Sequence, residues 1–222
     1  LEKKTIILAK KHKIKVSTIL DHWVNYKERF MLNNKTILPD EIFTQDYFAF
    51  NLAKKYFRGV KIIKIPNYYL NASLKELKLF KVNKDNNFLY LSEPIQSHYK
   101  KGILFDKNRD YDEYQSLKFF LNNVNRISQN IKKIIIRLHP SDKRFKYNNI
   151  ISKFKHLPIR LSNNNSLLKD ISQSSIIFGC ETLAMVIALM AKKRVLCTIP
   201  PKSKSKCSLP YKSIEYLKDL IN

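Results

Sequence analysis

A histidine shortly after a run of isoleucines is the first candidate for chemistry in this chain. In "KKIIIRLHPSD" (132–142), the segment 134–136 is typical of a fully buried strand, and His139 with Pro140 follows within three residues. An imidazole changes its charge near neutral pH, so it can donate a proton or bind an anion. The same residues also fit a strand end and a turn in which His139 is partly exposed and idle, because two residues make a weak motif.

Two more polar sequences follow apolar runs in the same way. Glu93 ends the run in "NFLYLSEP" (87–94), and "GCET" (179–182) follows "SIIF". In a parallel sheet, ligands gather at the carboxyl ends of the strands. We therefore expect Glu93, His139 and the turn at 179–182 to face one crevice.

The turn at 179–182 leads from a buried strand through Gly179 into a long apolar helix expected at 181–193. The first amide groups of such a helix have no partner inside it and carry the positive end of its dipole, which favours an anion. Thr182 adds a hydroxyl. Glu181 and Thr182 are also residues that commonly cap a helix, and the two interpretations are compatible.

Strand and helix patterns alternate along the chain, which indicates parallel sheets covered by helices. We predict two α/β units, residues 1–70 and 71–222, joined near 67–86 by a connector that contains "NYYLNASLKEL". The first unit starts on a helix with no strand before it, so we expect that its upstream part is missing. Helices are expected at 2–12, 46–57, 111–128, 146–155, 166–174, 181–193 and 213–222, and strands at 14–20, 41–45, 61–66, 87–94, 133–140, 158–162, 175–179 and 194–200.

The bulk composition is that of a folded, soluble protein. The 222 residues are 44% hydrophobic and 12% aromatic, enough for sizeable cores. No apolar run approaches the roughly 18 to 20 residues that span a bilayer, and the first residues lack the cleavage site of a signal peptide. The three cysteines form no C-x-x-C pair, and Cys180 and Cys197 lie in apolar segments, so we expect a reducing, cytoplasmic setting without structural zinc.

The net charge of +24 allows two interpretations. It fits a polyanionic partner such as nucleic acid, anionic lipid or a nucleotide. The lysines, however, are scattered among many Asn and Ile residues, which also suggests a compositional bias without functional meaning. Part of the excess fits an enzyme at an anionic membrane face, where each basic residue contributes about 1 kcal/mol.

Several common nucleotide and metal motifs are absent from the sequence. There is no G-x-G-x-x-G and no G-K-[ST], and the chain has only three glycines, so an NAD enzyme and a P-loop NTPase are disfavoured. Asp40 and Glu41 form an acidic pair, but without the D-x-D spacing of metal-dependent transferases. We expect no metal.

Together, "RLHPSD", the earlier "FLYLSEP" and the later "SSIIFGCETLAMVIALMAKKRVLCTIP" resemble the nucleotide-binding half of bacterial GT-B glycosyltransferases, especially sialyltransferases and related nonulosonic-acid transferases. "DHWVNYKERF" and "LPDEIFTQDYFAFNLAKKYF" resemble the acceptor half of capsule or surface-glycan transferases. The resemblance implies two Rossmann-like units facing a cleft and transfer of a sugar, such as sialic or pseudaminic acid, from a CMP donor to a surface glycan. The paired serine or threonine pattern of sialyltransferases is not matched, since this turn has Cys180, Glu181 and Thr182.

The resemblance implies a role for each strand end. His139 would hydrogen-bond or protonate the leaving phosphate, together with the amino end of the helix at 181–193. Glu93 or Glu181 would bind ribose hydroxyls, because a carboxylate accepts from two such donors. The remaining donor-site residues of the motifs are Arg137, Pro140, Gly179, Cys180 and Thr182.

The acceptor hydroxyl needs a general base on the opposite wall. Asp21 and His22, which follow the strand at 14–20, are the candidates, and Asp21 would alternatively orient His22. A plain polar turn with Trp23 packed as a lid fits "DHW" equally well.

Two rival functions fit parts of the same pattern. A nucleotide-sugar epimerase or hydrolase of the same architecture would use the same phosphate site with a different base. A basic nucleic-acid-binding module fits the charge, but the aromatic residues lie at positions expected to be buried, without an exposed aromatic row. We therefore expect no nucleic acid partner.

Overall fold

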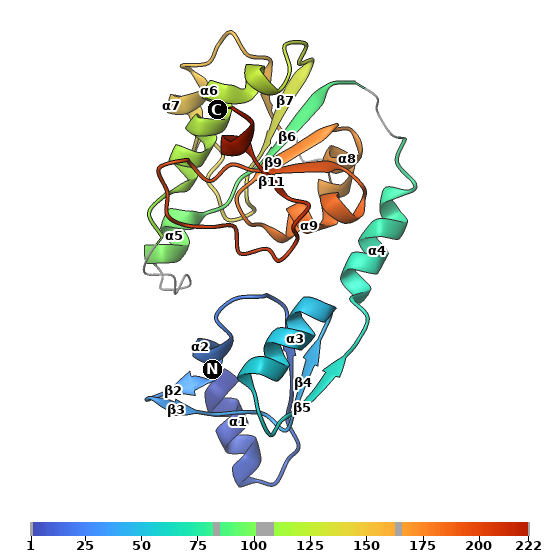
Figure 1. Cartoon of the computed structure of the whole chain (residues 1–222), viewed down its shortest axis with the longest axis vertical. Coiled ribbons are helices and arrows are strands. Elements are labelled where there is room, and N and C mark those ends of the chain that lie inside the picture. The colour runs from blue at the N-terminus through green and yellow to red at the C-terminus, as the bar shows by residue number, and fades with distance from the viewer. Residues whose placement is uncertain (1, 82–84, 101–108, 163–165, 222) are drawn as a thin grey trace. The chain divides into compact units, whose positions relative to one another are not determined.

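The computed structural model describes residues 2–81, 85–100, 109–162 and 166–221, and they divide into two compact units, Leu1–Asn71 and Ala72–Asn222. Figure 1 shows the elements of each unit. Both units are mixed α/β and are built on parallel sheets.

The first unit contains a three-stranded parallel sheet in the order β1-β4-β5. A small core that includes Leu20, Phe30, Ile42 and Phe57 lies between this sheet and its helices. A hairpin of β2 and β3 turns at Asn33 and Asn34. The elements are α1 (Glu2–Lys11), β1 (Ser17–Leu20), α2 (Tyr26–Arg29), β2 (Met31–Leu32), β3 (Lys35–Thr36), β4 (Glu41–Thr44), α3 (Tyr47–Tyr56) and β5 (Lys61–Lys64).

Helix α4 (Tyr68–Leu77) adds to one prediction: the expected connector "NYYLNASLKEL" is helical, and the boundary between the two units falls within it. The Asn67 side chain caps it by accepting from the backbone amide of Leu70 at 2.9 Å. Ser73 and Leu77, four residues apart, are its buried side chains, so one face of the helix packs.

The second unit is built on a six-stranded, wholly parallel sheet in the order β11-β10-β9-β6-β7-β8. Numbered along the chain from β6, these strands lie in the order 3-2-1-4-5-6 of doubly wound, Rossmann-type sheets. The elements are β6 (Asn87–Leu91), α5 (Ile95–Lys100), α6 (Glu113–Ile127), β7 (Lys133–Arg137), α7 (Asn148–Ile151), β8 (Ile159–Leu161), α8 (Leu167–Ser172), β9 (Ile176–Gly179), α9 (Leu183–Met190), β10 (Arg194–Cys197), β11 (Glu215–Tyr216) and the 3-10 helix η1 (Leu217–Leu220).

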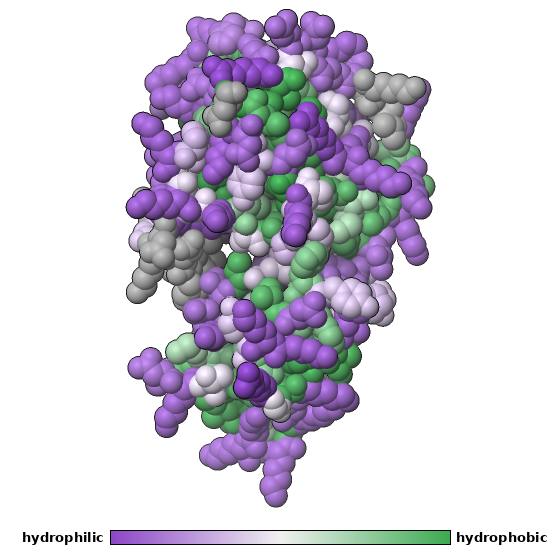
Figure 2. Space-filling model, in the orientation of Figure 1, coloured by the Kyte–Doolittle hydropathy of each residue, from purple (hydrophilic) through white to green (hydrophobic). Residues whose placement is uncertain are grey.

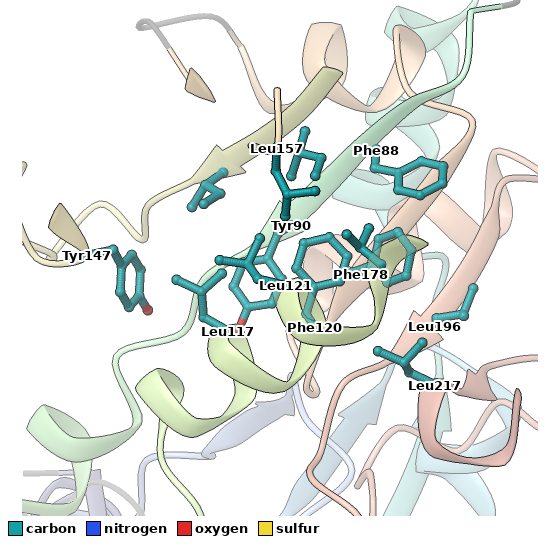
Figure 3. Close-up of a cluster of buried hydrophobic side chains, with 13 residues drawn as sticks. Phe88, Tyr90, Leu117, Phe120, Leu121, Tyr147, Leu157, Phe178, Leu196 and Leu217 are labelled. Carbon is teal, nitrogen blue, oxygen red and sulfur yellow. The ribbon is translucent and has the colours of Figure 1, made fainter. Parts of the chain in front are cut away.

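Helix α6 and the central strands form the core of the second unit. A capping box of Asp112 and Gln115 starts the helix. In Figure 3 the ring of Phe120 lies against that of Phe178, with centroids 4.5 Å apart, and Tyr90 stacks on Phe120 at 5.2 Å. This buried packing holds β6 and β9 side by side, and these are the strands that matter for the site.

The carboxyl terminus corrects one prediction, because 213–222 is not a single helix. Glu215 and Tyr216 form the short strand β11 on the open edge of β10, and η1 follows. Arg194 donates to the Glu215 carboxylate from Nε at 2.8 Å and from Nη2 at 2.7 Å. Pairing with a strand edge is a tertiary interaction, so it overrides the local helical pattern. The sequence also missed α2, α5 and the hairpin.

Hydrophilic side chains cover most of the face shown in Figure 2. Among the helices in the described part of the chain, none is long and apolar enough to cross a membrane.

Candidate functional site

The carboxyl ends of β6 and β9 mark the topological switch point of the second sheet. The two strands are neighbours, with Tyr90 opposite Phe178, although they are the first and fourth strands of the unit. Connections leave the two strand ends in opposite directions at such a point, which opens a crevice where doubly wound sheets bind ligands. The residues that follow are Ser92 and Glu93 on one side and Cys180 and Glu181 on the other.

Glu93 reaches across this switch point and holds the turn after β9. One of its carboxylate oxygens, Oε1, accepts from the backbone amides of Cys180 at 3.2 Å and Glu181 at 2.7 Å. Gly179 lets the end of β9 pack closely against Leu91 of β6 and Met185 of α9. A Cβ at this position would lie 3.0 Å from the sulfur of Met185 and 3.3 Å from the carbonyl oxygen of Leu91. Two of the three predicted strand ends therefore meet directly.

Two carboxylates and one guanidinium make up the charged part of this site. Burial, followed by the charge of Glu181, raises the pKa of Glu93 to about 7, although Arg109 and the two amides act in the opposite direction. Glu181 forms an ion pair with Arg109, and the two side chains are only 10% and 8% exposed. Glu181 also accepts from the amide of Ser208 at 3.2 Å, and Arg109 donates to the hydroxyl of Tyr111 at 2.8 Å.

Thr182 caps helix α9, as one of the two interpretations of the sequence expected. Its hydroxyl accepts from the amide of Ala184 at 3.4 Å. Glu181 does not cap the helix, because its carboxylate is paired with Arg109. The amides that precede the helix, those of Cys180 and Glu181, are occupied by Glu93 and not open.

His139 lies beside the switch point and is anchored to the end of β6. Its backbone amide donates to Asp142 Oδ2 at 3.1 Å, and the same oxygen accepts from the hydroxyl of Ser92 at 3.0 Å. Its ring faces that of His98 of α5 nearly at a right angle, with centroids 5.8 Å apart. All three predicted strand ends thus lie on neighbouring strands in the order β9-β6-β7, so β6 lies between His139 and the turn after β9.

The surroundings of the His139 ring favour its neutral form. Nδ1 accepts from the backbone amide of Ser141 at 3.2 Å and lies 2.7 Å from the Ser141 hydroxyl, so the neutral ring carries its proton on Nε2. Burial lowers the pKa of His139, His98 and Lys146 lower it further, and only Asp142 raises it. In the free protein His139 is therefore a neutral Nε2–H donor at pH 7, which suits hydrogen bonding to a phosphate, one of the two roles expected from the sequence, and not protonation of it.

Beneath His139 is a buried ion cluster that the sequence did not reveal. Lys146 Nζ lies 2.7 Å from Asp142 Oδ1 and 2.7 Å from Glu113 Oε1. Glu113 also accepts from the backbone amide of Gln96 at 2.9 Å. The i, i+4 spacing of Asp142 and Lys146 is the only sequence signal, and such pairs usually lie on exposed helix surfaces.

The remaining donor-site candidates have other partners. The Arg137 guanidinium pairs with Asp170 of α8 at 2.7 Å and donates to Ser162 at 3.3 Å. Pro140 is exposed in the turn after β7. Burial raises the pKa of the Cys180 thiol, whose sulfur lies 3.0 Å from the hydroxyl of Ser116, so it is an unreactive thiol.

In the first unit, Asp21 is paired with Arg29. Arg29 Nη1 lies 2.6 Å from Asp21 Oδ1, and Nη2 donates to the carbonyl of Ile19 at 3.1 Å. Partial burial raises the pKa of Asp21, but the hydrogen bond from Arg29 and the charge of His22 outweigh it, and the pKa lies below its usual value. A carboxylate so stabilised is a weak base, so His22 is the better candidate. The Trp23 indole donates to Asp46 at 2.9 Å, which ties it to the start of α3.

A cavity of about 260 Å³ lies next to Arg109 in the second unit. Its lining combines aromatic rings with a guanidinium, an amide and a carboxylate, which suits a small polar ligand with a flat face. The residues are Ile95, Gln96, Tyr99, Arg109, Tyr111 and Asp112. Sequence reasoning missed it, because Arg109 and α5 carry no motif.

Comparison with known proteins adds no family assignment: no protein-family model matches the chain, and no curated protein matches it. Within the described residues, no group of three or more His, Cys, Asp or Glu side chains is arranged to hold a metal ion.

Proposed function

We propose that this protein is a metal-independent glycosyltransferase with the two-unit GT-B architecture, in which the second unit binds a nucleotide sugar. The observation that carries the proposal is the 3-2-1-4-5-6 parallel sheet, whose switch point brings Glu93 onto the turn at 179–182 with His139 on the adjoining strand. Nucleotides bind at this position in doubly wound sheets.

The groups at the strand ends suit departure of a phosphate. As the bond to the sugar breaks, negative charge develops on the leaving phosphate, and fixed N–H donors stabilise it. His139 would supply Nε2–H, and the amino end of α9 would supply backbone amides and its dipole. The His139 donor needs no reorganisation, because Ser141 orients the ring. The amides of Cys180 and Glu181 would first have to be released by Glu93, which accepts from both.

We further propose that the donor is a CMP-linked nonulosonic acid, such as sialic or pseudaminic acid, and that the acceptor is a bacterial surface glycan. The first unit would supply the acceptor side, with His22 or Asp21 as the base. Such a reaction takes place in the cytoplasm, at the inner membrane face, where the +24 charge favours anionic lipid.

A ligand panel and a transfer assay test the proposal. CMP should raise the melting temperature more than UDP or GDP, since a ligand at 100 times its Kd stabilises by about 2.7 kcal/mol. CMP-sugar with a glycan acceptor should then give a glycosylated product, whose mass is followed by mass spectrometry. Stabilisation by UDP alone would overturn the cytidine donor. Free sugar released at the same rate without acceptor would replace the transferase by a hydrolase or epimerase.

A further inference from the structure

We propose that Glu93 is an internal competitor for an anion site: its carboxylate occupies the backbone amides of Cys180 and Glu181, and an anionic group of a ligand binds there in its place. The inference rests on the proposed function in one respect, because it takes the natural anion to be the phosphate of the donor.

The geometry of the turn is that of an anion-binding site already filled from within. Two successive backbone N–H groups converge on a single oxygen, Glu93 Oε1, at 3.2 and 2.7 Å. Successive amides before a helix are the donors that bind phosphate and sulfate oxygens in proteins. The acceptor here is the carboxylate of Glu93, which follows the neighbouring strand β6 and is not part of α9. The Glu93 side chain can therefore be displaced without unfolding α9.

Arg109, the ion-pair partner of Glu181 in this turn, adds a second and separate argument for an anionic ligand. Its side chain is 8% exposed, and two of its nitrogens donate to Glu181 and to the hydroxyl of Tyr111. Its Nε is buried and has no hydrogen-bond partner in the part of the chain that the structure describes. An unfilled donor on a buried cation is costly, and an incoming anion would relieve that cost.

Competition of this kind makes anion binding depend on the charge of Glu93. Burial and the charge of Glu181 raise the pKa of Glu93 to about 7, so the carboxylate changes charge close to neutral pH. Of the other groups that face it, Arg109 stays charged, because its pKa is raised, and three stay neutral because burial raises their pKa. These three are Tyr90, Tyr111 and Cys180.

Sulfate is the probe of choice, because it keeps its two charges from pH 6 to pH 8 and contains no ribose. Binding to the full-length protein is measured by titration calorimetry at constant ionic strength. With a pKa of about 7, wild-type protein should bind sulfate about 10-fold more weakly at pH 8 than at pH 6. Glu93→Gln should remove most of this slope and bind sulfate and CMP more tightly than wild type at pH 8.

Glu215→Gln is the matched control. It removes the same charge from an exposed ion pair with Arg194, and it should keep the wild-type slope. The inference is overturned if wild-type sulfate affinity does not change with pH, or if Glu93→Gln binds CMP more weakly, as expected for a ribose-binding carboxylate. The wild-type measurement stands by itself if the variant folds poorly.

The two proposals fail separately. If sulfate competes with Glu93 but no sugar is transferred, the transferase proposal falls and the anion site stands. If transfer occurs but Glu93→Gln binds CMP no more tightly than wild type at pH 8, only the competition is refuted.

Discussion

The buried cluster around Lys146 gives a sharp prediction about what holds the site in place. Lys146 Nζ lies 2.7 Å from both Glu113 Oε1 and Asp142 Oδ1, and the three side chains are 8%, 2% and 4% exposed. Lys146→Met keeps most of the side-chain volume but leaves two buried carboxylates without their cation. Removing one partner of a buried ion pair costs about 3 to 5 kcal/mol. We expect a loss of about 4 kcal/mol in the free energy of unfolding of the second unit.

Urea unfolding followed by far-UV circular dichroism measures this loss. Lys153→Met is the control, because Lys153 is exposed, and it should change stability by less than about 0.5 kcal/mol. The same Lys146→Met change in a Glu113→Gln, Asp142→Asn background should cost much less, since no buried charge is then left unpaired. The reasoning is refuted if Lys146→Met costs under about 1 kcal/mol, or if its cost is the same in both backgrounds.

Three further predictions concern the candidate site. Replacing His139 with Ala should lower transfer turnover about 100-fold through loss of the Nε2–H donor, with little change in melting temperature because the Asp142 bond is to the backbone; full activity would remove His139 from the mechanism. His22→Ala should abolish transfer. Asp21→Asn should lower the free energy of unfolding by under about 1 kcal/mol, because its ion pair with Arg29 is exposed. If both variants transfer sugar at wild-type rates, the general base is another residue. The pKa of Glu93, raised from 4.5 to about 7, means that its stabilising contribution is complete below pH 4.5 and is lost as pH rises through 7. At 1.36 kcal/mol per pKa unit the loss is about 3 kcal/mol. The difference in unfolding free energy between wild type and Glu93→Gln should therefore change by that amount from pH 4 to pH 8. Parallel plots of unfolding free energy against pH for the two proteins would contradict this prediction.

The alternation of strand and helix was readable from the sequence because buried parallel strands are short apolar runs. Strands β6, β7 and β9 and helix α6 lie inside the predicted ranges. The lateral order of the strands was not readable, since it depends on crossovers packing against the sheet. The helix expected at 213–222 failed for the same reason: Glu215 pairs with a strand edge that only the folded sheet provides.

The site itself was half predictable. Rules for parallel sheets placed Glu93, His139 and the turn at 179–182 at strand ends, and the structure puts them on adjoining strands. What the Glu93 carboxylate contacts could not be foreseen, because a sequence does not show which amides a side chain reaches. Arg109 was missed altogether, since it carries no motif and lies 72 residues from its partner Glu181.

The buried charge clusters around Lys146 and around Arg109 differ in a way that distinguishes structural support from a candidate site. In the Lys146 cluster both carboxylates accept further hydrogen bonds, Glu113 from the amide of Gln96 and Asp142 from the hydroxyl of Ser92. A buried polar cluster stabilises a fold only when its groups are satisfied in this way. At the switch point, by contrast, Nε of the buried Arg109 has no hydrogen-bond partner among the described residues, and Glu93 is held where its ionised form is disfavoured. Selection for stability alone would remove both the unpartnered Arg109 donor and the disfavoured Glu93 carboxylate. Their position, at the switch point where doubly wound sheets bind ligands, is the physical reason to look there for the function of this protein.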